Sequence, residues 1–213
     1  MPKLLPPLLA VTAIFWQPTP AMAAPDESAI IHEMNRARAD PVGYARELEP
    51  LRRSFHGRIV REPGRPVDRI TNEGVSALDE AIAWLRRQRP RGPLDTNNRL
   101  ALAARDHTRS QGPTGVLGHG GHDGSSPLQR IERRGLSPYM VGEVIAYGPE
   151  TAREVVRELI IDDGVADRGH RDAIFEAEFT RAGAACGPHA AYGAMCVVEF
   201  ADDSDSAQTA SIY

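Results

Sequence analysis

The sequence lacks the short motifs that identify the commonest enzyme classes. It has no phosphate-binding Walker loop, no Gly-x-Ser-x-Gly turn, no Cys-x-x-Cys pair and no His-Glu-x-x-His helix, because His32-Glu33 is not followed by a second histidine. Lysine is almost absent: Lys3 is the only one among 25 basic residues, and the formal net charge is −4. We therefore expect no nucleic-acid partner and no basic surface for an anionic membrane.

The first 23 residues have the organisation of a secretory signal peptide. Lys3 precedes an apolar stretch at 4–16, and Ala21-Met22-Ala23 has the small-x-small form of a cleavage site. The apolar stretch is too short to span a membrane. We predict a secreted protein, extracellular or periplasmic, that loses residues 1–23 and has no transmembrane segment in its mature chain. An uncleaved N-terminal anchor is the alternative.

Cysteine is scarce, and both copies, Cys186 and Cys196, lie in the predicted mature chain. An even count in an oxidising compartment favours a disulfide. Gly187-Pro188 and Tyr192-Gly193 are turn signals between the two cysteines, so we expect a β-hairpin cross-linked near its turn. Two buried free thiols are the alternative, and neither cysteine is assigned a catalytic or metal-binding role.

Hydrophobic periodicity predicts several helices followed by a β-hairpin. Helices are expected at 26–49 with a break at Asp40-Pro41, at 71–89, from a cap at Asp95 or Thr96 to residue 112, at 126–135 and at 150–162; strands are expected at 141–147, 179–186 and 194–201. Residues 50–70 are predicted to form a long surface loop with at most one short strand, and 202–213 a disordered acidic tail. Little βαβ alternation is present, which indicates one α+β domain.

Imidazole and carboxylate groups are concentrated in the stretch from 119 to 170. The candidates are His119, His122, Glu143, Asp162, Asp163 and His170. Two neutral imidazoles with one or two carboxylates can bind zinc or another divalent ion, and the same groups can do acid–base chemistry on a bound water. The alternatives are solvated histidines in a glycine-rich loop and aspartates that cap a turn. His107 is expected to be a packed helix histidine.

Four stretches, in this order, resemble the CAP superfamily of cysteine-rich secretory, antigen 5 and pathogenesis-related proteins, in its bacterial SCP-like branch. They are His119 with residues 123–127 and the helix through Ile131, then Gly142-Glu143-Val144-Ile145-Ala146, then Gly169-His170-Arg171, and then residues 183–200. With Asn35 and Arg38, the resemblance extends over most of 28–201, apart from an insertion with an extra helix at about 50–93.

The resemblance implies an α-β-α sandwich with a central polar cavity. A His/acid/acid/His tetrad would line the cavity: His119, Glu143, Asp162 and His170. Asp162 is placed there rather than Asp163 because Leu159 occupies the position of a family tryptophan three residues before the acid. Two departures weaken the match: the family usually has a longer glutamate at position 162, and it has asparagine where this chain has Val144. His122 is expected to lie beside the tetrad.

By resemblance, the protein would be a secreted, non-enzymatic binding domain. Its partner would be a small molecule, a lipid, or an extracellular protein or cell-wall surface. The cavity would be able to hold zinc or another divalent metal, with His119 and His170 as ligands. One alternative is a secreted metal-dependent hydrolase, a peptidase or esterase, with Glu143 as general base. The other is a purely structural extracellular module.

Overall fold

The computed structural model describes residues 25–64 and 67–204 of the 213-residue chain. The predicted signal peptide at 1–23 and most of the predicted tail, 205–213, lie outside the described residues. The helices are α1 (Glu27–Ala39), α2 (Pro41–Leu48), α3 (Val75–Leu85), α4 (Asn98–Gln111), α5 (Pro127–Arg133), α6 (Ala152–Ile161) and α7 (Gly169–Phe175), with 3₁₀ helices η1 (Glu49–Ser54) and η2 (Gly112–Thr114). The strands are β1 (Phe55–His56), β2 (Ile59–Val60), β3 (Arg69–Ile70), β4 (Asp95–Thr96), β5 (Val141–Tyr147), β6 (Arg181–His189) and β7 (Gly193–Ala201).

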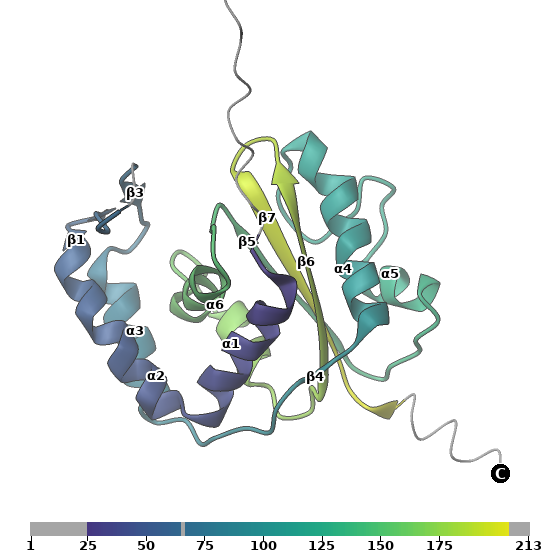
Figure 1. Ribbon diagram of the computed structural model, residues 1–213, viewed down its shortest axis with the longest axis horizontal. Helices are drawn as coiled ribbons and strands as arrows, with labels where there is room; N and C mark the ends of the chain where they lie inside the picture. The colour runs from purple at the N-terminus through teal and green to yellow at the C-terminus, as the bar shows by residue number, and fades with distance from the viewer. Residues whose placement is uncertain (1–24, 65–66, 205–213) are drawn as a thin grey trace, which may run out of the picture.

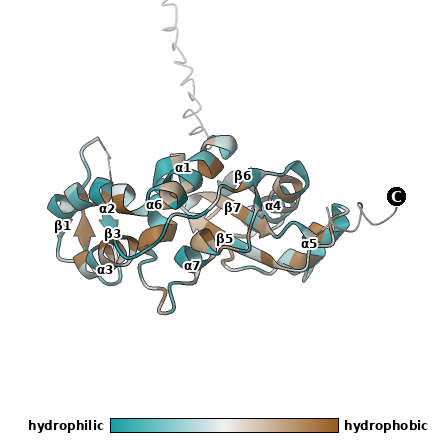
Figure 2. Ribbon diagram, turned by 90° about the horizontal axis from the view of Figure 1, so that it is seen from below, coloured by the Kyte–Doolittle hydropathy of each residue, from teal (hydrophilic) through white to brown (hydrophobic). Residues whose placement is uncertain are grey.

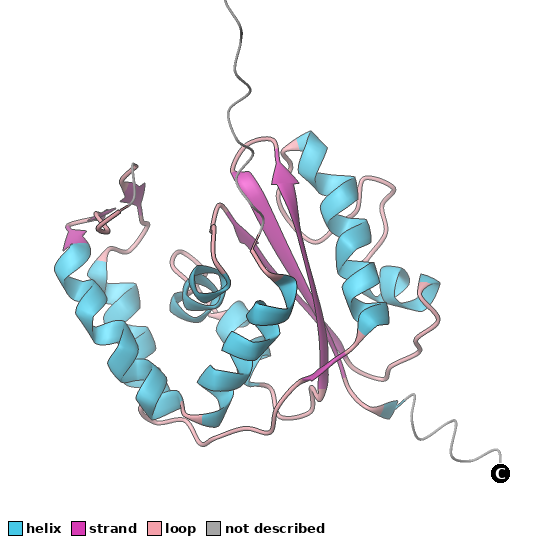
Figure 3. Ribbon diagram, in the orientation of Figure 1, coloured by secondary structure: helices cyan, strands magenta, loops and turns pink. Residues whose placement is uncertain are grey.

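A mixed four-stranded sheet in the order β4-β6-β7-β5 separates two layers of helices (Figures 1 and 3). β4 runs parallel to β6, and the other neighbours are antiparallel. α4 packs on β6 and β7, with α5 beside it against β5, whereas α1, α6 and α7 cover the opposite face. The predicted α+β fold with helices on both faces of a sheet is therefore confirmed.

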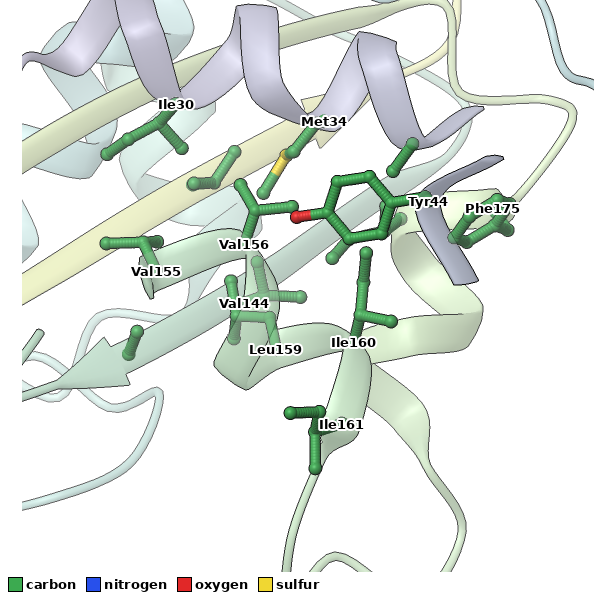
Figure 4. Packing of buried hydrophobic residues seen from close by; sticks show 14 of the residues in the cluster. Ile30, Met34, Tyr44, Val144, Val155, Val156, Leu159, Ile160, Ile161 and Phe175 are labelled. Atoms are coloured by element: carbon green, nitrogen blue, oxygen red, sulfur yellow. The ribbon is translucent and has the colours of Figure 1, made fainter. Parts of the chain in front are cut away.

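The larger hydrophobic core lies between the sheet and α1, α6 and α7. Figure 4 shows this packing, in which Met34 of α1 and Val156 of α6 lie close to Val144 of β5. The next residue, Ile145, points the other way and packs with Ala104 of α4. Successive residues of a strand alternate between the two faces of the sheet, so each strand contributes side chains to the hydrophobic core on either face. In Figure 2 the hydrophobic colour is concentrated around the strands and the inward sides of the helices.

Polar caps set several helix boundaries, and the predicted break at Asp40-Pro41 is confirmed. Asp26 caps α1, and Asp40 ends α1 and caps α2, which starts at Pro41. The predicted cap of α4 at Asp95 or Thr96 is wrong, because Asn97 accepts the capping N–H groups. Asp95-Thr96 instead forms β4, whose backbone pairs with β6. Tertiary pairing thus moves the start of α4 by one or two residues.

The predicted disulfide-linked hairpin is confirmed. Cys186 and Cys196 lie opposite each other in the β6–β7 register, with a Cα–Cα distance of 4.1 Å, and their sulfurs are bonded. The sequence predicts that Gly187-Pro188 lies in the turn. In the structure these residues instead continue β6, where Pro188 pairs with Ala194. The strands therefore run closer to the turn than the sequence signals indicate.

The insertion contains the predicted extra helix, α3, but its first part holds a 3₁₀ helix and three short strands rather than a long surface loop with at most one strand. After η1, strands β1, β2 and β3 form a small antiparallel sheet, followed by α3. This unit lies beyond α6, on the side of the molecule away from α4 and α5 (Figure 1). Its turn donates backbone N–H groups from Asn72 and Glu73 to Asp163, at 2.6 and 2.8 Å, and Glu80 pairs with Arg171. The insertion therefore holds the segment between α6 and α7 in place.

Arg38 connects α1 to three distant parts of the chain. Its guanidinium is 1% exposed and donates to the carbonyl oxygens of Gly92, Ile174, Glu176 and Phe179, at 2.8, 2.6, 2.9 and 3.3 Å. Burial lowers the pKa of Arg38 to about 10, so the side chain stays charged at neutral pH. These bonds hold the entry to β4 and the connection between α7 and β6.

Replacing Arg38 with methionine keeps most of the side-chain volume but leaves four carbonyl groups without their donor. We expect Arg38→Met to lower the free energy of unfolding by about 3–4 kcal/mol. The control, Arg36→Met on the same helix, removes half-exposed ion pairs with Glu33 and Glu47 and should cost less than about 1 kcal/mol. Urea denaturation measures both, and equal losses would contradict the role of Arg38.

The disulfide should stabilise the fold by restricting the unfolded chain. Its cysteines are 10 residues apart, which corresponds to about 2–3 kcal/mol in the chain-entropy model. We expect the double variant Cys186→Ala/Cys196→Ala to lose that amount in urea denaturation. Wild-type protein in excess reductant should match the variant, and a wild type that reductant leaves unchanged would contradict the prediction.

Candidate functional site

The first predicted pair, His119 and Glu143, is in direct contact on the α4/α5 side of the sheet. Glu143 projects from β5 with a side chain only 1% exposed, and its Oε1 is 2.8 Å from Nδ1 of His119. The imidazole itself is 52% exposed. Because an ionised carboxylate only accepts, Nδ1 carries the proton, and the neutral ring has its lone pair on Nε2. Glu143 therefore fixes both the orientation and the tautomer of His119.

Arg130 holds the other oxygen of Glu143. The guanidinium on α5 is 1% exposed, and its Nη2 lies 2.5 Å from Oε2 of Glu143. Burial of Glu143 opposes ionisation, but hydrogen bonds with His119 and Glu199 and the charge of Arg130 outweigh it and lower the pKa of Glu143. The carboxylate is therefore ionised at neutral pH although it is buried.

Glu199 is a member of this site that the sequence analysis missed. It lies directly opposite Glu143 in the β5–β7 register and is 0% exposed. Nη2 of Arg130 is 3.6 Å from its Oε1, and in the described part of the chain no donor is within hydrogen-bonding distance of either oxygen. Burial, then the negative charge of Glu143, raise the pKa of Glu199 well above its ordinary value. A neutral Glu199 can donate its proton to Glu143.

His107 lies near Glu143 and Arg130. It is 0% exposed on α4, and its Nε2 donates to the carbonyl oxygen of Gly118 at 3.0 Å. Burial lowers the pKa of His107, which favours the neutral ring. The prediction of a packed helix histidine is confirmed. His122 is exposed, and its backbone N–H donates to Ser110, so it lies outside the His119–Glu143 contact.

The second predicted pair, Asp162 and His170, lies between α6 and α7. Asp162 ends α6 in the left-handed conformation, with φ 56°, and its Oδ1 is 2.7 Å from Nδ1 of His170. Its Oδ2 accepts the backbone N–H groups of His170 and Arg171 at 3.0 and 3.3 Å. Asp162, rather than Asp163, therefore contacts His170. Helix α7, which carries His170, was not predicted from the sequence.

The four residues form two His–acid pairs, carried by elements of the two helix layers. His119–Glu143 lies with α5, whereas Asp162–His170 belongs to α6 and α7, and β5 between them is an edge strand. Within residues 25–64 and 67–204, no group of three or more His, Cys, Asp or Glu side chains is arranged to hold a metal ion. A pocket near Phe55, Ile70 and Ile161 lies between the insertion and α6. The central cavity and a metal site at His119 and His170 stay predictions.

A comparison of the sequence with models of protein families identifies the family of this chain. The family model for CAP, the cysteine-rich secretory protein family, matches residues 80–200, more than half of the chain. This chain belongs to the CAP family. The matched region runs from α3 to β7 and includes both His–acid pairs, whereas α1, α2 and the small sheet β1–β3 precede it.

Two solved structures are similar to the CAP chain. An outer surface protein from Borrelia burgdorferi is 20% identical with a TM-score of 0.45, and the match covers 53% of this chain and 79% of that one. An extracellular SCP-domain protein from Bacillus anthracis is 17% identical with a TM-score of 0.45, and the match covers 53% of this chain and 35% of that one. The CAP chain thus matches about a third of the Bacillus protein. A comparison with curated proteins finds no match.

In the part of the CAP chain that the structure describes, no helix has the length and apolar character needed to cross a membrane. The predicted disulfide lies within the family match, on β6 and β7.

The raised pKa of Glu199 has a consequence for stability. The folded protein holds this proton more tightly than the unfolded chain, so wild type loses stability as pH rises above about 4.5, until the folded pKa is passed. Glu199→Gln is uncharged in both states and avoids this loss. We expect its stability advantage over wild type to grow by up to about 1.4 kcal/mol per pH unit above that point.

Urea denaturation between pH 4 and pH 8 measures this difference. The matched control is Glu132→Gln on the exposed side of α5, whose difference from wild type should stay within about 0.5 kcal/mol throughout. A pH-independent difference for Glu199→Gln would contradict a protonated Glu199.

Proposed function

We propose that this CAP-domain protein is an extracellular binding protein whose ligand contacts His119 and His170. The observation that carries the proposal is the shared construction of the two sites. In each, a carboxylate with a 1% exposed side chain holds Nδ1 of the imidazole, at 2.8 Å for His119 and 2.7 Å for His170. Both rings remain partly exposed, and Nε2 has no described protein partner.

Rings held in this way suit binding because less side-chain freedom is lost when a ligand arrives. The bare Nε2 of a neutral ring accepts a hydrogen bond. We therefore expect the ligand, whether a small molecule, a lipid head group or a cell-wall surface, to offer hydroxyl or amide donors. Arg168 and Glu73 support the segment that carries His170, so the insertion contributes to this side of the site.

An extracellular location is supported by three features. The disulfide suits an oxidising compartment, the first 23 residues have signal-peptide organisation, and the family description is of secretory proteins.

The hydrolase alternative has less support than binding. Glu143 would have to act as a general base, yet His119 and Arg130 engage one oxygen each and the side chain is 1% exposed. A base must reach the proton that it removes, either directly or through one water. If the protein hydrolyses a substrate, His119 has the more accessible basic nitrogen.

The binding proposal is tested on protein purified from its native secretion. Native mass spectrometry should detect a retained molecule on wild type, and the double variant His119→Ala/His170→Ala should lose it. The matched control, His122→Ala, removes an exposed histidine of the same loop and should retain the molecule. A molecule that stays on the double variant, with the fold intact by circular dichroism, would place the binding surface elsewhere.

A further inference from the structure

We propose that Arg130 is a built-in cation that fills the space between Glu143 and Glu199, where two buried carboxyl groups beside His119 would otherwise offer a divalent metal a site. The CAP resemblance implies a divalent metal with His119 and His170 as ligands. The residues around Glu143 do not fit a metal site that extends inward from His119. The inference concerns the buried side of the site and goes beyond the proposed ligand contact at Nε2.

The contacts of Arg130 fix its guanidinium in this place. Nη1 donates to the carbonyl oxygens of Ser125 and His119, at 2.9 and 3.1 Å. Nη2 points between the two carboxyl groups, 2.5 Å from Glu143 and 3.6 Å from Glu199. The side chain is 1% exposed, so the guanidinium cannot swing into solvent without opening the packing of α5 against the sheet.

Charge and geometry both oppose a second cation here. Oε1 of Glu143 bonds to His119 and Oε2 bonds to Arg130, so a metal at the short distance of about 2.0–2.2 Å that zinc requires would compete with a bond that each oxygen already makes. A divalent ion between the two carboxyl groups would also lie next to a buried positive charge, which low-dielectric surroundings make costly. Glu143 therefore orients His119 without taking part in metal binding.

The same geometry predicts what removal of Arg130 would create. Glu143, Glu199 and the backbone oxygens that Arg130 now binds would surround an empty, negatively charged space next to His119. Carboxylates and an imidazole are a suitable donor set for zinc. Arg130→Met should therefore convert a site that excludes metal into one that binds it.

The experiment is titration of the full mature chain with zinc alone by isothermal calorimetry. We expect Glu199→Gln to change any zinc affinity of wild type by less than about twofold, because its oxygens bind no metal there. Arg130→Met should bind one zinc per chain at least about tenfold more tightly than wild type, and the added Glu199→Gln change should remove that gain.

Arg130→Lys is the matched control, since it keeps the positive charge and should gain no zinc affinity. A wild type whose zinc affinity falls tenfold or more in Glu199→Gln overturns the proposal, and this measurement does not require Arg130→Met to fold. A folded Arg130→Met that binds zinc no better than wild type also overturns it. Failure of the ligand proposal would leave these results unchanged, because that proposal is judged on the molecule retained at His119 and His170.

Discussion

The buried ion pair between Arg130 and Glu143 is the interaction on which the described site depends. A carboxylate that is 1% exposed stays ionised only if positive charge and hydrogen bonds compensate for the lost hydration, and Arg130 and His119 provide both. Arg130 also holds the loop of His119 through two carbonyl oxygens. The ion pair therefore sets the position of the loop, the charge of Glu143 and the tautomer of His119 together.

The sheet then determines how the remaining residues are shared between its faces. Along β5, Glu143 and Ile145 face α4 and α5, whereas Val144 and Ala146 belong to the core under α1 and α6. The pair Asp162–His170 lies on that second side, held by the insertion through Asp163. The two His–acid pairs are similar, but different groups hold their carboxylates. A buried arginine holds Glu143, and backbone N–H groups hold Asp162.

Much of the fold could be predicted, because local patterns determine it. Caps at Asp26 and Asp40, the strand at 141–147 and the disulfide hairpin follow from signals within a few residues. The wrong predictions concern elements that depend on pairing with other segments rather than on local sequence. β4 is two residues long and exists through pairing with β6, and the small sheet of the insertion is built from strands of two residues each. Such short elements carry no periodicity of their own.

Residue types in a recognisable order were enough to indicate the CAP family, the cysteine pair and the four His and acid residues at 119, 143, 162 and 170. Three-dimensional packing was needed to show that these four form two separate pairs and that Glu199 and Arg130 complete one of them. Glu199 follows two apolar residues in β7 and gives no sign of its partner, because strand register alone places it opposite Glu143. Register depends on the whole sheet, and burial there turns an ordinary glutamate into a proton-holding group.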